Sequence, residues 1–230
     1  ASDADGKRVK RIRMKDASPL TTHYQRDGLG RIVRVVDPAG NQWLYGYDGL
    51  GRRTGVSDPD LGSWSYAFDN ASRLVTQVDA KGQRTALSYD AMSRLTRKDV
   101  HTAAGIETTT NTYDEARDGF FNLGQLTTAV RTTGAKRFTQ AYDYDATGRL
   151  ARRSDLGVNG QDYAQSFVYW PDGTLKRKQL ADGTWTGTYR YDEAGRLFSI
   201  GNANPPSGTE PEQFISSILY NARGQTTAIS

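Results

Sequence analysis

The heptapeptide Tyr144-Asp145-Ala146-Thr147-Gly148-Arg149-Leu150 decides how this chain folds, because close copies of it recur along almost the whole sequence. Each copy has an aromatic residue, an aspartate, two variable residues, a glycine or serine, an arginine and usually a leucine. Four further near-complete copies begin at Tyr47, Phe68, Tyr89 and Tyr191. Self-similarity at a spacing of about 20 to 50 residues indicates a repeat architecture, in which each copy is one small supersecondary unit.

The conserved chemistry of each copy is typical of a turn. Its aspartate can accept hydrogen bonds from backbone N–H groups ahead of it, and its glycine permits a left-handed backbone. Ser72 and Ser93 replace that glycine, at a small expected conformational cost. We expect the arginines to pair with aspartates of the same or a neighbouring copy. The signature residues are Tyr47, Asp48, Gly51 and Arg52; Phe68, Asp69, Arg73 and Leu74; Tyr89, Asp90, Arg94 and Leu95; Tyr144, Asp145, Gly148, Arg149 and Leu150; Tyr191, Asp192, Gly195, Arg196 and Leu197.

The segments between signatures have the pattern of β-hairpins. Degenerate copies at Tyr24, Tyr113, Tyr169 and Tyr220 bring the number of signatures to nine. Between them, each unit has a Gly-containing turn near its middle, such as residues 37–40, flanked by short alternating segments. Short alternating segments joined by such turns predict hairpins.

Aromatic residues that lead into the signatures alternate with small or polar ones, as Trp43, Tyr45 and Tyr47 do. A period of two residues places them on one face of a β-sheet. The chain is therefore predicted to be all-β, with about eight tandem hairpins over residues 24–230 in one continuous sheet. We expect core packing to bury the aromatic face, so that replacing Tyr47 or Tyr144 by alanine costs ~3–5 kcal/mol.

The tandem Tyr-Asp-x-x-Gly-Arg-Leu units resemble the YD repeats of the RHS proteins over roughly residues 24–230. This resemblance implies a β-sheet ribbon that spirals into a hollow shell, as in bacterial RHS polymorphic toxins, the B and C components of insecticidal toxin complexes, and animal teneurins. In the bacterial members the shell encloses a toxic C-terminal domain. The resemblance thus implies a curved spiral sheet, part of a hollow shell, that is secreted or displayed at the cell surface within a larger exported protein. The implied partners are the remaining shell repeats or a second copy of the chain, and an encapsulated guest polypeptide.

One element of the bacterial pattern is not found in the sequence. Those proteins carry, after their last repeats, a core region that cleaves itself beside the toxin through acidic residues and an Asp-Pro-x-Gly-Leu element. Residues 37–40 read Asp-Pro-Ala-Gly, but Asn41 follows them and they lie at a turn between early repeats. We therefore interpret the chain as a non-catalytic segment of a larger shell.

The composition excludes several other kinds of site. The chain of 230 residues has no cysteine and only two histidines, which excludes disulfide scaffolds, thiol nucleophiles and cysteine-based zinc sites. No run approaches the roughly 18 apolar residues of a transmembrane helix, so no membrane span is expected. Asp143 and Asp145 could hold a cation or act as acid and base, but Asp145 already belongs to a signature turn. We expect no catalytic residue, no metal site and no cofactor.

The N-terminal segment is strongly basic, with six cations among residues 7–15 in a chain whose net charge is +4. Such a patch can bind nucleic acid. Alternating basic and apolar residues equally suit a solvated edge strand that discourages aggregation between sheets. We favour the edge strand and expect no nucleic-acid partner, so residues 1–23 are interpreted as a basic edge segment that ends a preceding repeat.

The aromatic face also suggests an alternative function. Rows of tyrosine and tryptophan can stack on sugar rings, so the alternative function is a carbohydrate-binding or cell-surface adhesion module. Its ligand-facing residues would be Trp43, Trp64 and Trp185. A shell would turn these indoles toward its interior, whereas a lectin would leave them open to a sugar.

Overall fold

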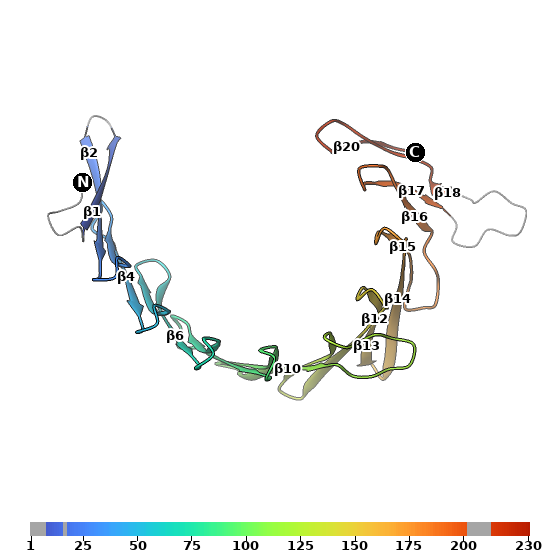
Figure 1. Ribbon diagram of the computed structural model, residues 1–230, viewed down its shortest axis with the longest axis horizontal. Helices are drawn as coiled ribbons and strands as arrows, with labels where there is room; N and C mark the ends of the chain where they lie inside the picture. Colours follow the sequence, from blue (N-terminus) through green and yellow to red (C-terminus); the bar gives the residue numbers. More distant parts are fainter. Residues whose placement is uncertain (1–7, 16–17, 202–212) are drawn as a thin grey trace, which may run out of the picture. The chain divides into compact units, whose positions relative to one another are not determined.

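The computed structural model describes residues 8–15, 18–201 and 213–230, whose regular elements are all β-strands (Figure 1). They divide into two compact units, residues 1–109 and 110–230, with the boundary inside one strand. The prediction of an all-β chain of tandem hairpins is confirmed. Among the described residues there is no helix long and apolar enough to cross a membrane.

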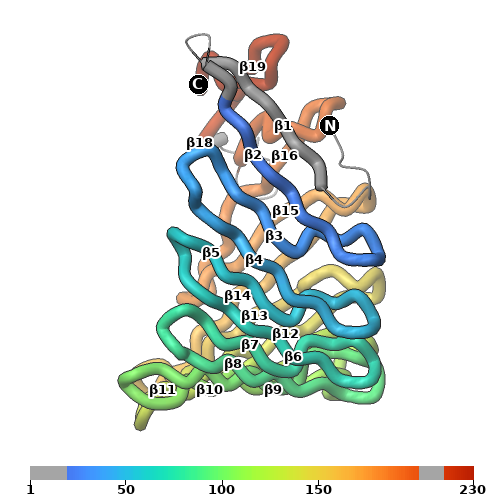
Figure 2. Tube along the Cα trace, turned by 90° about the vertical axis from the view of Figure 1, so that its left-hand side faces the viewer, coloured from blue at the N-terminus to red at the C-terminus, as the bar shows by residue number. Residues whose placement is uncertain are grey.

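The first unit contains strands β1 to β9 and the first part of β10. Successive strands pair antiparallel with their neighbours in sequence order, and Figure 2 shows the hairpins following one another in that order. The strands are β1 (Arg8–Lys15), β2 (Ser18–Arg26), β3 (Ile32–Val36), β4 (Gln42–Tyr47), β5 (Arg53–Asp58), β6 (Gly62–Phe68), β7 (Leu74–Val78), β8 (Arg84–Tyr89), β9 (Leu95–Thr102) and β10 (Gly105–Tyr113).

The second unit begins within β10 and continues to the last strand. Strands β11 to β15 extend the order of the preceding strands, while β16 to β18 and β19 to β20 form two smaller sheets. The strands are β11 (Leu126–Thr133), β12 (Lys136–Tyr144), β13 (Leu150–Val158), β14 (Gln161–Tyr169), β15 (Leu175–Gln179), β16 (Thr188–Tyr191), β17 (Leu197–Gly201), β18 (Gln213–Ile215), β19 (Ile218–Tyr220) and β20 (Thr226–Ile229).

The basic N-terminal segment contributes the first strand. Residues 8–15 form β1, which pairs with β2 from Arg8 opposite Gln25 to Lys15 opposite Ser18. It stands first in the order of the 15-stranded sheet. Residues 1–7 and 16–17 of the predicted edge segment lie outside the described residues.

A β-bulge or similar irregularity marks the end of the strands that carry the five near-complete signature aromatics, which are β4, β6, β8, β12 and β16. In β4 the register shifts between Gly46 and Tyr47, so that Tyr47 lies opposite Arg53 rather than Thr54. The same shift occurs before Phe68 and Tyr89. A bulge bends the strand and increases its twist. The signature therefore closes the hairpin and also imposes the same local distortion on each repeat.

The sheet has little fully buried apolar surface. Strands β4 and β6 alternate between half-buried and exposed residues, with the aromatic side chains half-buried. Only Ala141 and Ile218 are buried hydrophobic residues among those described. The expectation that the signature tyrosines are fully buried is therefore wrong, since Tyr47 and Tyr144 are half-buried. Their rings pack sideways against neighbouring strands of one layer, which leaves part of each ring open.

The strand pairing differs from the single continuous sheet predicted for residues 24–230. Among the described residues, strand pairing beyond β15 continues through an isolated bridge between Gln179 and Trp185 and a backbone hydrogen bond from Thr186 to Lys178. The backbone N–H of Lys178 donates a 3.1 Å hydrogen bond to the side-chain hydroxyl oxygen of Thr186. In a regularly paired strand the acceptor would be a backbone carbonyl. Because a side chain replaces the backbone acceptor, regular pairing stops before β16.

Candidate functional site

Each signature turn is closed by its aspartate. In the turn after β4, Oδ1 of Asp48 accepts hydrogen bonds from the backbone N–H groups of Leu50 at 3.0 Å and Arg52 at 2.9 Å. Oδ2 of Asp48 accepts a hydrogen bond from Nε of Arg52 at 2.7 Å. Gly51 completes the turn with a φ of 82°, which glycine adopts without steric cost. One carboxylate therefore fixes both the backbone and the arginine.

The arginine fixed in this way also reaches the next repeat. Nη1 of Arg52 donates a hydrogen bond to the carbonyl of Asp69 at 2.8 Å, and its guanidinium lies 4.9 Å from the centre of the Phe68 ring. Nη1 of Arg73 bonds the carbonyl of Asp90 at 3.0 Å in the same manner, with its guanidinium 5.0 Å from the Tyr89 ring. Each arginine thus joins two consecutive turns through a hydrogen bond and a cation–π contact.

The tyrosine hydroxyl completes the link in the reverse direction. The hydroxyl of Tyr89 donates to the carbonyl of Leu74, the residue that follows Arg73, at 2.8 Å. In the second unit, the hydroxyls of Tyr169 and Tyr220 donate to the carbonyls of Leu150 and Leu197, both at 2.7 Å. We call this arrangement of aspartate, arginine and aromatic ring the Asp-Arg-aromatic ladder. Its ion pairs are Asp27–Arg31, Asp48–Arg52, Asp69–Arg73, Asp90–Arg94, Asp145–Arg149 and Asp192–Arg196.

The predicted pairing of arginine with aspartate within a copy is thus observed at all five near-complete signatures. Ser72 and Ser93 adopt φ values of 61° and 64°, the left-handed region in which glycine stands elsewhere. Their hydroxyls accept hydrogen bonds from Arg52 at 3.2 Å and Arg73 at 3.3 Å. The serines therefore add a contact to the ladder in exchange for backbone strain.

Hydrogen bonding in the turns keeps the aspartates ionised. The backbone N–H of Arg73 is the largest influence on Asp69, and with the Arg73 side chain it lowers the pKa of that carboxyl below its usual value. The Arg196 side chain is the first cause of the lowered pKa of Asp192. At Asp145 burial alone raises the pKa, but hydrogen bonds from Thr147 and Arg149 outweigh it and lower the pKa to about 2.

The turn after β10 departs from this pattern because seven extra residues separate Asp114 from its glycine, Gly124. The side chain of Arg117, within the insertion, donates to the carboxylate of Asp143 at 2.8 Å and to that of Glu115 at 2.9 Å. Only 3% of Asp143 is exposed. The insertion is therefore fastened to β12 by an ion pair whose acidic member is buried.

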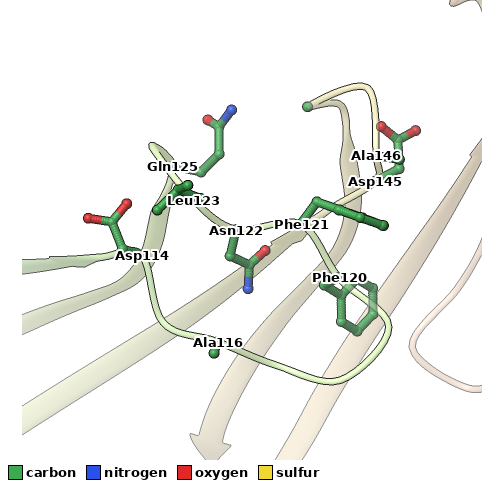
Figure 3. A pocket seen from close by; sticks show the side chains of 10 residues that line it. Asp114, Ala116, Phe120, Phe121, Asn122, Leu123, Gln125, Asp145 and Ala146 are labelled. Atoms are coloured by element: carbon green, nitrogen blue, oxygen red, sulfur yellow. The ribbon is translucent and has the colours of Figure 1, made fainter.

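Asn122 fastens the same insertion a second time. Its Nδ2 donates to the carbonyl of Glu115 at 3.0 Å and to the Asp143 carboxylate at 3.2 Å, while its Oδ1 accepts the Tyr144 N–H at 3.0 Å. The backbone N–H of Phe121 donates to the Tyr144 carbonyl at 2.9 Å. Figure 3 shows this loop with Asn122 between the turns of Asp114 and Asp145.

This arrangement places Asp143 and Asp145 in separate environments. Asp143 is bound by Arg117 and Asn122, whereas Asp145 is bound within its own turn. Within the described ranges, no group of three or more His, Asp or Glu side chains could hold a metal ion. The two carboxylates therefore bind side chains of the protein, each in its own place, and do not converge on the cation site that the sequence left open.

The three tryptophans singled out in the sequence are all half-buried. The indole N–H of Trp43 donates to the Asp58 carboxylate at 3.0 Å, and that of Trp64 lies 3.4 Å from the Leu61 carbonyl. The guanidinium of Arg177 lies 4.5 Å from the Trp185 ring. Each indole thus interacts with its own hairpin or the adjacent strand, and a role in binding sugars remains a prediction.

The RHS Repeat family matches residues 26–61 and 68–108. Both stretches contain the regular turns of the Asp-Arg-aromatic ladder. The chain thus carries RHS repeats in these two stretches. No curated protein matches it in sequence.

Solved structures share the RHS-repeat fold over nearly the whole chain. The crystal structure of TcdB2-TccC3 has a TM-score of 0.72 and 19% identity, over 96% of this chain and 12% of that chain. The crystal structure of TcdB2-TccC3-TEV has a TM-score of 0.70 and 20% identity, over 95% of this chain and 12% of that chain. The structure of the Photorhabdus luminescens Tc holotoxin pore has a TM-score of 0.55 and 17% identity, covering 93% and 13%. The chain thus spans about an eighth of the chains that it matches.

The repeats of the second unit vary the ladder more than those of the first. At Trp170 the aspartate is absent, but Nη1 of Arg149 still donates to the Trp170 carbonyl at 3.2 Å. At Asn221 a neutral side-chain hydrogen bond to Gln225, 2.9 Å long, replaces the ion pair. These degenerate copies are visible in the sequence, whereas the role of Arg117 is not, because it depends on the fold around the insertion.

Proposed function

We propose that this chain is a non-catalytic segment of the wall of an RHS shell, which encloses a polypeptide guest until delivery. The observation that carries the proposal is the bond from each ladder arginine to the following turn, such as Arg52 to the Asp69 carbonyl. Because the arginine of each repeat donates a hydrogen bond to a backbone carbonyl of the next repeat, the same contact can be made again and again, and the sheet can extend through many repeats. A wall needs this property, whereas a catalytic site does not.

The ionised turns support the same proposal. Surface ion pairs are individually worth only about 0–1 kcal/mol. Here each pair also closes a turn and holds the arginine against the next aromatic ring, as Asp48 and Arg52 do against Phe68. Repetition of a modest link distributes stability along the sheet, as expected for repeat proteins whose neighbours supply the interfaces. The proposed partners are further RHS repeats and the guest, within a larger exported protein.

Protection of the guest tests the proposal. The longer protein that contains this chain is digested with trypsin under native conditions, and intact guest is followed by mass spectrometry. We expect the guest to be cut much more slowly than in the isolated state. Arg73→Ala removes one ladder arginine and should increase guest cleavage, whereas Arg97→Ala removes an arginine that pairs with Asp99 outside the ladder and should not.

Two results would overturn the proposal. Equal cleavage of the guest inside and outside the protein would contradict enclosure. Binding of the purified chain to immobilised glycans, lost in Trp43→Ala but retained in Arg73→Ala, would instead support the carbohydrate-binding alternative.

A further inference from the structure

The arginine of the Asp-Arg-aromatic ladder is absent at three degenerate signatures, where Gln125, Thr174 and Gln225 replace it, and the first of these lies beside a cavity. The degenerate signature of Tyr113 carries Gln125 where the near-complete copies carry arginine. In the first unit, Nη1 of Arg31 lies 3.5 Å from the point where a Cβ on Gly51 would stand. Nε2 of Gln125 lies 3.4 Å from the corresponding point at Gly148. Gln125 therefore points to the next turn as a ladder arginine does, with a shorter and neutral side chain.

The aromatic ring at this position keeps only part of its usual environment. The hydroxyl of Tyr144 donates to the Leu126 carbonyl at 3.0 Å, as in other repeats. Over the part of the chain that the structure describes, however, no cation lies above the Tyr144 ring, whereas the rings of Tyr89 and Tyr169 each have an arginine at 5.0 and 4.8 Å. The Tyr144 ring thus lacks the guanidinium that covers the rings of Tyr89 and Tyr169.

A cavity of about 550 Å³ opens beside Gln125. Its walls combine aromatic, aliphatic, amide and carboxylate groups, and none of the lining residues is a lysine or an arginine (Figure 3). Oδ2 of Asp145 faces a single donor among the described residues, Nε of Arg149, and a carboxylate oxygen can accept a second hydrogen bond. The lining residues used below are Phe120, Phe121, Leu123, Gln125, Asp145 and Gly148.

The apolar side of the cavity is open to solvent although its backbone is firmly held. Phe121 is 61% exposed and Leu123 is 88% exposed. Between them lies Asn122, which is 4% exposed and forms hydrogen bonds on both sides of the loop. Exposed apolar side chains on a fixed backbone are a common feature of interaction sites, because their position needs no further ordering on binding.

We propose that this cavity binds the arginine side chain of a second polypeptide, which supplies the guanidinium that the ladder lacks at this position. The aliphatic part of such an arginine fits against Leu123 and Phe121, and its planar head can stack on a ring while donating to Asp145 and to the Gln125 carbonyl oxygen. The cavity is lined by carboxylates and by no lysine or arginine, and this favours a basic partner even though Asp145 is also paired with Arg149. The inference stands independently of whether the chain encloses a guest.

A peptide titration tests the proposal directly. The probe is acetyl-Gly-Gly-Arg-Gly-Gly-amide, and its control carries citrulline, a neutral side chain of nearly the same shape. Amide signals of Gly124 and Gly148 in the full chain are followed by NMR. We expect both to shift with millimolar affinity for the arginine peptide, and about tenfold weaker binding of the citrulline peptide. Equal binding of the two peptides, or shifts confined to other residues, would overturn the proposal.

Two variants of this chain sharpen the test. Gln125→Arg should complete the ladder internally, abolish the peptide-induced shifts and raise the melting temperature. Leu123→Ser should weaken peptide binding without changing the circular dichroism spectrum, whereas Leu50→Ser, at a leucine 73% exposed in a regular turn, should not weaken it. Unchanged binding in Gln125→Arg would overturn the proposal. So would concentration-dependent dimerisation that Leu123→Ser abolishes but excess arginine peptide does not, because the occupant would then not be an arginine side chain.

Discussion

The regular RHS repeats of residues 26–108 and the insertion of residues 114–125 both hold their turns with an aspartate–arginine ion pair, but the two pairs differ in sequence separation and in burial. In the regular repeats, each aspartate pairs with an arginine four residues later, as Asp48 does with Arg52, and both side chains stay 22–23% exposed. In the insertion, Arg117 pairs with an aspartate 26 residues away, Asp143, whose side chain is only 5% exposed. A regular turn is thus held by a local ion pair that stays partly exposed, whereas the insertion is held by an ion pair to a buried aspartate on another strand.

The distribution of buried residues shows the same difference. The buried polar residues of the described chain all lie in the second unit: Asn122, Thr127, Asp143, Ser154 and Ser199. Three of them, Asn122, Thr127 and Asp143, surround the insertion or its anchoring strands. A buried polar group is costly unless it is hydrogen-bonded, so such a cluster tolerates substitution poorly. We expect the first unit to respond gradually to mutation and the insertion to respond sharply.

The largest effect should come from acid, which acts on all ladder turns together. The folded-state pKa values of Asp69 and Asp90 lie below the unfolded value because the turns hydrogen-bond the ionised form. The stability that depends on these charges is therefore complete above about pH 4 and is lost as the pH falls through the folded-state values. We expect the urea midpoint, measured by circular dichroism, to fall steeply between about pH 4 and pH 2.

The turn of Asp145, whose folded pKa is about 2, should be the last to lose its charge. NMR titration of the carboxyl groups can follow each turn separately. A urea midpoint that stays constant down to pH 2 would contradict the dependence of the fold on ionised turns.

A second comparison uses two arginines of similar exposure. The side chain of Arg117 is 27% exposed and that of Arg52 is 22% exposed. Arg117→Ala leaves the carboxylate of Asp143 buried without its ion partner and should reduce the free energy of unfolding by about 3–5 kcal/mol. Arg52→Ala leaves Asp48 in contact with water and should cost about 1 kcal/mol. Equal losses in urea unfolding would show that burial of the partner does not distinguish the two regions.

A smaller effect is expected from the tyrosine hydroxyls. Tyr89→Phe removes the 2.8 Å hydrogen bond to the Leu74 carbonyl and should cost about 1 kcal/mol. The chain offers a natural control, since Phe68 already lacks the hydroxyl. Phe68→Tyr should recover up to about 1 kcal/mol by reaching the carbonyl of Arg53. If both substitutions destabilise the chain, the hydroxyl link is specific to individual repeats and does not belong to the ladder.

The smallest effect concerns the left-handed serines. Ser72→Gly removes the strain of a φ of 61° but also the 3.2 Å hydrogen bond from Arg52. The two changes oppose each other, so the net gain in unfolding free energy should stay below about 0.5 kcal/mol. The reverse substitution in the neighbouring repeat, Gly51→Ser, should cost about 1 kcal/mol at most, because a serine there can make the same hydrogen bond from Arg31. Differential scanning calorimetry can resolve both changes, and a gain of several kcal/mol in Ser72→Gly would contradict this balance.

Sequence reasoning predicted the parts of the candidate site that depend on near neighbours. Asp48 and Arg52 lie four residues apart in one turn, so their pairing could be expected without knowledge of the fold. The strand order also followed, because hairpins joined by short turns pair with their neighbours. The half-buried state of Tyr47 could not be inferred, since the alternating pattern that indicates one sheet face does not say whether another layer covers it.

The sequence by itself determined the hairpin repeat, the closing of each turn by aspartate and the face on which the aromatic residues lie, because these features depend on contacts within one or two repeats. Only the tertiary structure decided that Arg117 meets a buried Asp143, that Gln125 leaves a cavity in the ladder and that pairing stops after Gln179. These features depend on side chains brought together from distant positions or on the length of one side chain relative to the space around it. Neither the contacts between distant residues nor the fit of one side chain to its surroundings recurs at a fixed spacing along the chain, so neither is visible in the repeat pattern.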